Sequence, residues 1–305
     1  MPRFRAWNAT CFVSPSMRVV IALEPDADSR WAADGIHIFP LSDPLEVVLV
    51  SALDVPRPPL TSPGPAARRL YGAAITGLRA RARHGAEAAI DGLRAALRPR
   101  TASVAVRIVD DQPAPAIVHA AASWDADLIL MGASARGAIG RALLGSVADQ
   151  VVRTAPCPVL LAKRRVARFE RMLVATDGSL HAEAALRFVA ALPVPPSTEL
   201  RVCAVSEAMD GGAAMLLLLT DTEKRMALRS VTKALDILAT LSCPLQSSVR
   251  HGDAGRELVD EVRRWVPDLL VMGARGRTAG SEVALGRVSA SLLRHATCPT
   301  LVYRG

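Results

Sequence analysis

Three glycines near the C-terminus, Gly273, Gly276 and Gly286, have a spacing that could bring the backbone against a phosphorylated ligand. They follow an apolar run at 269–271 and precede a pattern typical of a helix. Glycine has no Cβ, so the backbone can approach a ligand closely, and a helix N-terminus favours anions such as phosphate. The pattern favours a nucleotide-binding loop; the alternative is a tight turn that binds nothing.

A carboxylate and several arginines accompany this loop. Asp177 ends an earlier predicted strand, where its carboxylate could accept a hydrogen bond from an adenine edge or hold a metal. Arg287 begins the helix after the loop, and its fixed positive charge could clamp a phosphate or fold over the pocket. Arg275 and Arg277 add further positive charge nearby.

Other familiar site chemistries do not match. The loop has no lysine, which the phosphate-binding P-loop requires, and it lacks the G-x-G-x-x-G of dinucleotide-binding folds. The earlier sequence GASAR (132–136) misses the G-x-S-x-G of serine hydrolases because Arg136 replaces the last glycine. The six histidines show no metal-ligand spacing, and no Cys-x-x-Cys pair is present. Without a lysine clamp or a general base, we expect a binding protein rather than an enzyme, with at most slow nucleotide hydrolysis.

The loop occurs twice in the chain. Residues 131–161 and 272–302 are similar throughout, and their glycines and a Cys-Pro pair match at an offset of 141 residues. An earlier match, 19–24 with 172–177, has an offset of 153, so the first copy holds twelve extra residues. The chain is therefore predicted to be a tandem duplication. We expect an N-terminal extension at 1–16, a first domain at 17–165 and a second domain at 166–305.

Within each copy, short aliphatic runs alternate with longer helical patterns. In the second copy, strands are predicted at 171–176, 199–205, 245–253, 268–273 and 299–303, and helices at 179–192, 220–241, 254–266 and 287–296. Ser179 is the expected N-cap of the first of these helices. This alternation implies a parallel sheet with helices on both faces. Such sheets bind ligands beyond the C-terminal ends of their strands, where Asp177 and the glycine loop would lie.

The first copy follows the same scheme less regularly. Its strands are predicted at 18–24, 45–53, 103–109, 127–132 and 158–162, and its second helix at 67–97. Prolines and a glycine interrupt 25–44, so the first helix cannot be regular throughout. The twelve extra residues are expected around 54–69, where prolines and glycine break regular structure.

The composition indicates a soluble protein with an aliphatic core. Half the residues are hydrophobic, only 4% are aromatic, and no apolar run approaches the ~20 residues of a membrane span. The net charge of +8 comes from arginines scattered among acids, and stacking aromatics are scarce, so nucleic acid is an unlikely partner. The five cysteines do not suggest a disulfide framework, and Cys157 and Cys298 are expected to be small buried hydrophobes. We expect a cytoplasmic protein without a membrane partner.

The loops and strand ends resemble those of the universal stress protein family. Nucleotide-binding members of that family carry G-x2-G-x9-G-(S/T) after the fourth strand, an aspartate at the end of the first, and a closing strand like PCPVLVV. The second copy has the three glycines at this spacing and Asp177 in the aspartate position, and the first copy closes with PCPVLLA at 156–162. The resemblance covers about residues 17–305 and identifies the chain as a tandem two-domain member.

The resemblance implies an α/β fold of two tandem doubly wound domains. Each would have a five-stranded parallel sheet in the order 3-2-1-4-5, with helices on both faces. It also implies a role in the stress response and ATP as the ligand, alone or with Mg²⁺, or another adenine nucleotide. Family members pair through the fifth strand, so the two halves are expected to form an intrachain pseudo-dimer, which could associate further into a homodimer.

The residues expected to contact the nucleotide lie mainly in the second copy. They are Ala175, Thr176, Asp177, Val205, Gly273, Arg275, Gly276, Gly286, Arg287, Val288 and Ser289. The first copy supplies a degenerate counterpart at Gly132, Ser134, Gly145, Ser146 and Val147. It has Ala135 in place of the second glycine and Glu24 in place of the aspartate, whereas the second copy has Arg287 in place of Ser or Thr. No dedicated metal ligand is assigned, and a scaffold that binds protein partners without nucleotide is the alternative function.

Overall fold

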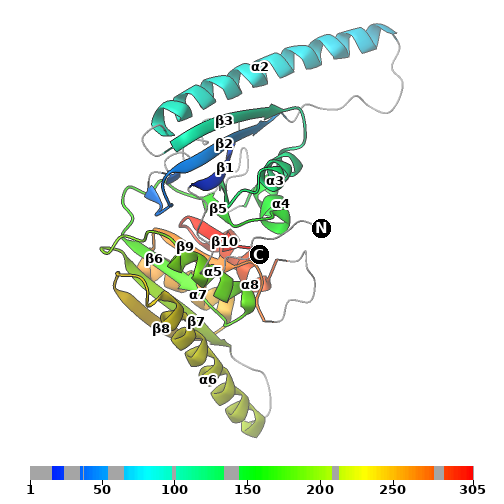
Figure 1. Cartoon of the computed structure of the whole chain (residues 1–305). Coiled ribbons are helices and arrows are strands. Elements are labelled where there is room, and N and C mark those ends of the chain that lie inside the picture. The colour runs from blue at the N-terminus through cyan, green and yellow to red at the C-terminus, as the bar shows by residue number, and fades with distance from the viewer. Residues whose placement is uncertain are drawn as a thin grey trace.

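The computed structural model describes residues 16–23, 35–36, 38–53, 65–97, 101–133, 144–207, 213–277 and 285–304. All but the last residue of the expected N-terminal extension, 1–16, lies outside these ranges. Figure 1 shows the two halves of the chain lying against each other, with strands β5 (Val159–Ala162) and β10 (Thr300–Tyr303) at the centre of the molecule.

The first half builds one side of the sheet. Its other strands are β1 (Met17–Leu23), β2 (Leu45–Ala52), β3 (Thr101–Val109) and β4 (Leu128–Gly132). Its helices are α2 (Pro65–Leu97), α3 (Pro113–Ser123) and α4 (Ser146–Thr154).

The second half repeats this order. Its other strands are β6 (Arg171–Ala175), β7 (Glu199–Glu207), β8 (Leu245–Gly252) and β9 (Leu269–Gly273). Its helices are α5 (Leu180–Ala190), α6 (Ala213–Leu238), α7 (Ala254–Trp265) and α8 (Arg287–His295). Ser179 caps α5 as predicted, because its side chain accepts a hydrogen bond from the Ala182 N–H.

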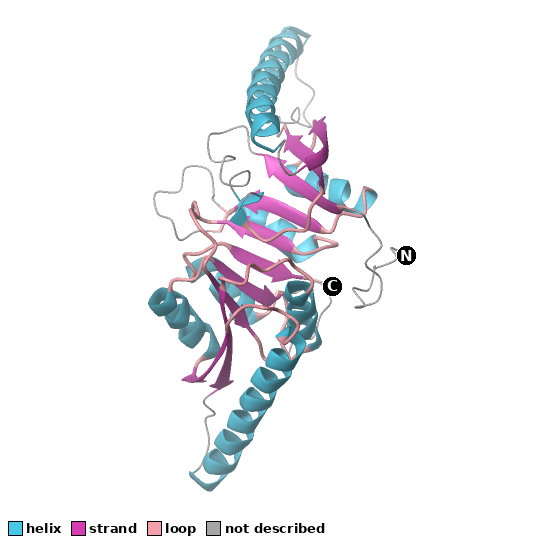
Figure 2. Cartoon of the chain, turned by 60° about the vertical axis from the view of Figure 1, so that its left-hand side comes forward, coloured by secondary structure: helices cyan, strands magenta, loops and turns pink. Residues whose placement is uncertain are grey.

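All ten strands form one sheet, in the order β3-β2-β1-β4-β5-β10-β9-β6-β7-β8. Within each half the strands are parallel and follow the predicted order 3-2-1-4-5, in mirror image. The halves join where β5 and β10 run antiparallel, with Leu160 opposite Leu301 and Val159 opposite Val302. The predicted pairing of the fifth strands within one chain is therefore confirmed. Figure 2 shows this continuous sheet with helices on both faces.

The two faces of the sheet carry separate hydrophobic cores, and both cores cross the junction. Neighbouring residues of a strand point to opposite faces. Leu160 and Leu301 therefore enter one core, while Leu161 and Val302 enter the other. Since each core contains side chains of both halves, neither half buries its fifth strand by itself.

The first half departs from the repeat where its first helix was expected to be irregular. Residues 35, 36 and 38 are helical, and Ile36, Phe39 and Leu41 are buried in the core on one face of the sheet. Phe39 packs edge-on against Phe169 of the segment that links the halves, with ring centroids 6.1 Å apart. Residues 24–34 lie outside the described part of the chain.

Two helix starts differ from the prediction. Helix α2 begins at Pro65, inside the stretch predicted to be irregular, because proline is well tolerated in the first turn of a helix. Helix α6 begins at Ala213, seven residues before the predicted start. The run from 213 to 219 favours a helix by propensity but has no polar face, so periodicity cannot detect it.

Figure 1 shows α6 extending well beyond the strands of its half. None of the helices that the structure describes combines the length and the apolar character that crossing a bilayer requires.

Candidate functional site

A cavity of about 330 Å³ opens at the C-terminal ends of the second-half strands. It lies among the end of β6, the end of β7, the loop after β9 and the first turn of α8. All eleven residues predicted for the second copy line it: Ala175, Thr176, Asp177, Val205, Gly273, Arg275, Gly276, Gly286, Arg287, Val288 and Ser289. The fold thus brings together residues that are up to 114 positions apart in the sequence.

Contacts within the protein require glycine at two of the three positions. A Cβ on Gly273 would lie 2.9 Å from the carbonyl carbon of His181, and one on Gly276 would lie 2.7 Å from Asp177 Oδ2. A Cβ on Gly286 would lie 3.4 Å from the Gly276 nitrogen, which is an ordinary contact distance. The glycine spacing therefore packs the loop after β9 against the start of α5 and the loop after β6.

The Asp177 carboxylate joins two loops. Its Oδ1 accepts a hydrogen bond from the Ser179 N–H at 3.0 Å, and its Oδ2 accepts one from the Arg277 N–H at 2.9 Å. Sequence reasoning assigned this carboxylate to a ligand or a metal, whereas here both oxygens bind backbone amides. Each oxygen keeps a second lone pair for a ligand in the cavity. Among the described residues, no three histidine, cysteine or acidic side chains gather as a metal site would require.

The first turn of α8 faces the cavity. Gly286 is its N-cap, and its N–H donates to the Ala274 carbonyl at 2.9 Å, which anchors the turn. Ser289 was predicted to contact the ligand, but its buried hydroxyl donates to the Gly273 carbonyl at 2.9 Å. Glycine has no side chain that could cap the first amides of the helix, and these amides have no acceptor within the helix itself. They are therefore the free donors at this end of the cavity.

Two of the arginines beside the cavity bind acidic residues of the protein. Arg287 donates from its two terminal nitrogens to Glu207 Oε1 and Asp253 Oδ2, both at 3.1 Å. Arg277 donates to Glu223 Oε2, also at 3.1 Å.

Sequence reasoning missed the acidic partners of Arg287. Glu207 ends β7 and Asp253 follows β8, and the C-terminal ends of parallel strands meet at one edge of a sheet. This regularity was the signal that could have found both residues.

Two titrating groups near the cavity are shifted. The pKa of Asp253 is lowered, chiefly by the hydrogen bond that its carboxylate accepts from the Arg256 N–H and further by Arg287. The pKa of His181 is lowered by burial first and then by the charges of Arg275 and Arg304. Both shifts favour an anionic Asp253 and a neutral His181 near neutral pH.

A residue of the first half binds the C-terminal end of α8, the helix whose first turn faces the cavity. Lys163 follows β5, and its Nζ donates to the Leu293 carbonyl at 2.6 Å and the Ala296 carbonyl at 2.9 Å, at the C-terminus of α8. A positive charge at the C-terminal end of a helix interacts favourably with the helix dipole. Burial lowers the pKa of Lys163 to about 8.

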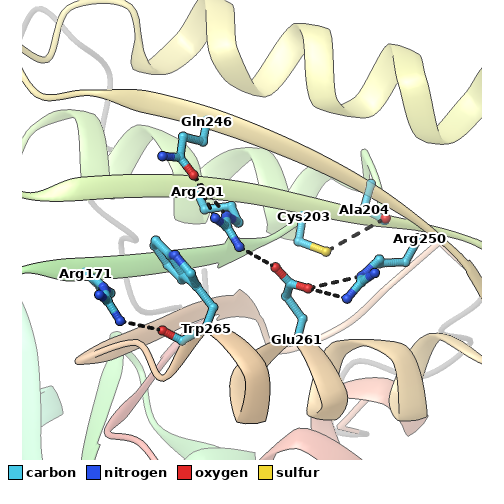
Figure 3. A network of polar contacts seen from close by, with 8 residues as sticks. All are labelled: Arg171, Arg201, Cys203, Ala204, Gln246, Arg250, Glu261 and Trp265. Carbon is cyan, nitrogen blue, oxygen red and sulfur yellow. Dashed lines mark hydrogen bonds and ion pairs between the residues drawn. The ribbon is translucent and has the colours of Figure 1, made fainter.

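A buried polar network anchors helix α7 to the sheet, as Figure 3 shows. Glu261 accepts hydrogen bonds from Arg201 Nη1 at 2.8 Å and from Arg250 Nη2 at 2.7 Å. The Arg201 guanidinium lies 4.3 Å from the centre of the Trp265 ring and also binds Gln246. The network holds α7, and with it Asp253 at the helix N-terminus.

Sequence reasoning missed this network as well. Glu261 lies on the apolar face of the predicted helix, at helical spacing from Leu258 and Trp265. An acidic residue at such a position signals a buried partner of opposite charge.

In the first half, four of the five predicted residues can be placed. Gly132 ends β4, Gly145 is the N-cap of α4, and Ser146 and Val147 begin that helix. The Gly145 N–H donates to the Ala133 carbonyl at 3.0 Å, which repeats the bond of Gly286 to Ala274. Ser134, Ala135 and Glu24 lie outside the described residues.

The cysteines that the structure describes are free and buried. Burial raises the pKa of Cys157 to about 12 and that of Cys298 to about 11. These thiols are therefore protonated and unreactive at neutral pH, and the prediction that both act as small buried hydrophobes is confirmed.

Comparisons with known sequences all point to the universal stress protein family. A sequence model described as the universal stress protein family matches residues 17–163 and 168–304. A universal stress protein of Thermus aquaticus is 48% identical over 56 residues, which are 18% of this chain and 41% of that protein. Universal stress protein Slr1230 of Synechocystis sp. is 23% identical over 181 residues, which are 59% of this chain and 58% of that protein. The chain therefore spans only about half the length of these two relatives.

Two solved structures show the same fold at low sequence identity. A universal stress protein from Archaeoglobus fulgidus has a TM-score of 0.64 at 19% identity, covering 94% of this chain and 98% of its own. One described as a putative universal stress protein from Pseudomonas aeruginosa has a TM-score of 0.61 at 16% identity, covering 94% of this chain and 92% of its own. An Arabidopsis thaliana family protein with AMP bound covers 44% of this chain and 90% of its own, with a TM-score of 0.34 at 19% identity.

Proposed function

Because the chain belongs to the universal stress protein family, we propose that the cavity of its second half binds an adenine nucleotide. One observation carries this proposal: the eleven residues expected from the family motif line a single cavity of about 330 Å³. Its position, at the C-terminal ends of parallel strands, is where this class of fold takes its ligands. Binding, rather than rapid catalysis, is the proposed activity.

The lining offers two kinds of surface that a nucleotide needs. Val205, Leu258 and Met272 supply apolar side chains that suit a base. The uncapped first turn of α8 supplies amide donors and the positive end of a helix dipole, which suit a phosphate. Asp177 lies between the two loops and keeps lone pairs for a donor such as an adenine amino group.

ATP is the expected ligand by family resemblance, and AMP is the natural comparison. Phosphates bound at α8 would account for a nucleotide site, but the described residues that line the cavity include no lysine to stabilise a phosphate in transfer. We therefore propose slow hydrolysis at most. Mg²⁺ would enter with the nucleotide, because acidic clusters able to hold a cation alone are absent from the described residues.

Isothermal titration of the full chain with ATP and with AMP tests this function. We expect one site per chain, since the first copy lacks the second glycine and the aspartate of the motif. Asp177→Ala and Gly276→Val should each weaken binding at least about tenfold, equivalent to about 1.4 kcal/mol. The first variant frees both loops, and the second drives a side chain into the Asp177 carboxylate.

Two matched variants control for charge and for size. Asp260→Ala removes an exposed carboxylate that pairs with Arg263 on the same helix, and Gly77→Val adds a side chain where nothing lies within 4 Å. Both should bind nucleotide like the parent chain. If Asp177→Ala and Gly276→Val also bind like the parent, the cavity is not the nucleotide site.

A scaffold that acts through protein partners is the second candidate function. The observation that favours it is that two of the three glycines, Asp177 and Arg287 have contacts within the protein that account for their presence. No heat of binding with either nucleotide, at concentrations up to the millimolar range typical of weak sites, would support the scaffold.

A further inference from the structure

The charged groups around the cavity do not favour a long phosphate chain. The arginines that line it are Arg275, Arg277 and Arg287, and the carboxylates that line it or pair with two of these arginines are Asp177, Glu207, Glu223 and Asp253. Along the lining itself, three arginines face two carboxylates, and Glu223 and Asp253 add two more just outside it. Although the loop is rich in arginine, Arg277 and Arg287 are therefore already paired with acidic residues of the protein.

Glu207, Asp253 and Arg287 form a cluster at the mouth of the cavity. They come from the end of β7, the N-cap of α7 and the first position of α8, so three neighbouring elements meet there. Both terminal nitrogens of Arg287 bind a carboxylate at 3.1 Å. A guanidinium at a helix N-terminus is repelled by the helix dipole unless an anion lies beside it, and here the protein itself supplies two anions.

We propose that Glu207 and Asp253 hold Arg287 as a latch, so that the cavity selects adenosine or its monophosphate over the triphosphate. This inference rests on the proposed nucleotide site. The first phosphate would gain the free amides of α8, as argued above. Further phosphates would find Arg287 already bound to two carboxylates.

The size of the effect follows from the charges. The side chain of Arg287 is 73% exposed, so water screens the cluster and each interaction is modest. Losing one carboxylate partly releases the Arg287 charge toward a phosphate, and two unit charges about 8 Å apart in water change an affinity roughly two- to threefold. Removing one carboxylate should therefore raise ATP affinity by about that factor, and removing both by about five- to tenfold.

The substitutions Glu207→Gln and Asp253→Asn remove charge with little change of shape. Asparagine is as good an N-cap as aspartate, so α7 keeps its start. Asp260→Asn is the matched control, because it removes one negative charge from the same helix and does not line the cavity. Circular dichroism checks that each full-length variant is folded.

Titration calorimetry with adenosine, AMP and ATP, at one fixed ionic strength near physiological, measures the selection. In the parent chain we expect AMP to bind at least as tightly as ATP. Glu207→Gln and Asp253→Asn should raise ATP affinity by the stated factors and leave adenosine unchanged, and Asp260→Asn should change neither. In an Arg287→Met background the effect of Glu207→Gln should shrink, because a latch acts through the arginine whereas simple repulsion does not.

Different results distinguish this inference from the proposed function. If the parent chain binds none of the three ligands, the proposed function fails and the latch fails with it. If it binds them but prefers ATP over AMP, or if the ratio of ATP to adenosine affinity is the same in all charge variants, nucleotide binding stands and the latch is wrong. An undiminished effect of Glu207→Gln in the Arg287→Met background also overturns the latch.

Discussion

Replacing Glu261 by glutamine should destabilise the second half by about 3 kcal/mol. The Glu261 side chain is 5% exposed and accepts three hydrogen bonds: from Arg201 Nη1 at 2.8 Å, and from Arg250 Nε at 3.0 Å and Nη2 at 2.7 Å. Removing one partner from a buried ion pair costs about 3–5 kcal/mol, because the other charge stays without compensation. Glutamine has nearly the volume of glutamate, so this substitution isolates the charge.

The structure places the expected loss of stability at the lower end of the range of about 3–5 kcal/mol. Arg201 and Arg250 are each about a quarter exposed, so water can partly solvate them after the change. Arg201 also keeps its bonds to Gln246 and its position over the Trp265 ring. A loss of about 3 kcal/mol is large against the 5–15 kcal/mol that stabilises a typical domain.

Urea unfolding followed by tryptophan fluorescence measures this loss, since Trp265 lies in the network. With a slope of about 2 kcal/mol per molar urea, the midpoint should fall by about 1.5 M. Asp260→Asn, one residue earlier on the same helix and exposed, should change stability by less than about 0.5 kcal/mol. If Glu261→Gln unfolds at the same urea concentration as this control, the buried charge does not hold α7 to the sheet.

Two further predictions concern the junction of the halves. Lys163 has a folded-state pKa of about 8, below its ordinary 10.5, so above pH 8 the unfolded chain binds more protons than the folded chain and stability rises with pH. From pH 7.5 to 9, the free energy of unfolding of the parent chain in urea should therefore rise by about 1 kcal/mol more than that of Lys163→Met. Parallel pH profiles of the two proteins would contradict this assignment. Residues 17–165 and 166–305 expressed separately should self-associate or aggregate, because each then exposes a fifth strand that pairs in the whole chain; two well-behaved monomers in sedimentation experiments would count against it.

Most of the fold could be predicted because its signals are local in the sequence. The repeat offset of 141 residues established two copies, and short apolar runs between amphipathic patterns located the strands of both halves within two residues at every end. Ser179 was recognised as an N-cap because capping depends only on the residues of one helical turn. Helix α6 was predicted to start too late, since an apolar run without a polar face carries no period.

The membership of the cavity was also predictable, because parallel strands place the C-terminal strand ends of one half along one edge. The contacts that its residues make within the protein were not predictable. The Asp177 carboxylate accepts hydrogen bonds from two backbone amides, and Arg287 binds two carboxylates. Glu207 is 80 positions from Arg287, and no local pattern states which acid will reach which base.

By itself, the sequence determined that this chain is a duplicated α/β protein with a glycine loop after the fourth strand of its second copy. The tertiary structure alone decided how its charges pair: Glu261 with Arg201 and Arg250, and Lys163 with the end of α8, 130 residues away. The physical reason is that hydrophobic periodicity acts over one turn or one strand. Ion pairs, by contrast, depend on distances of a few ångströms that exist only after helices have packed on the sheet.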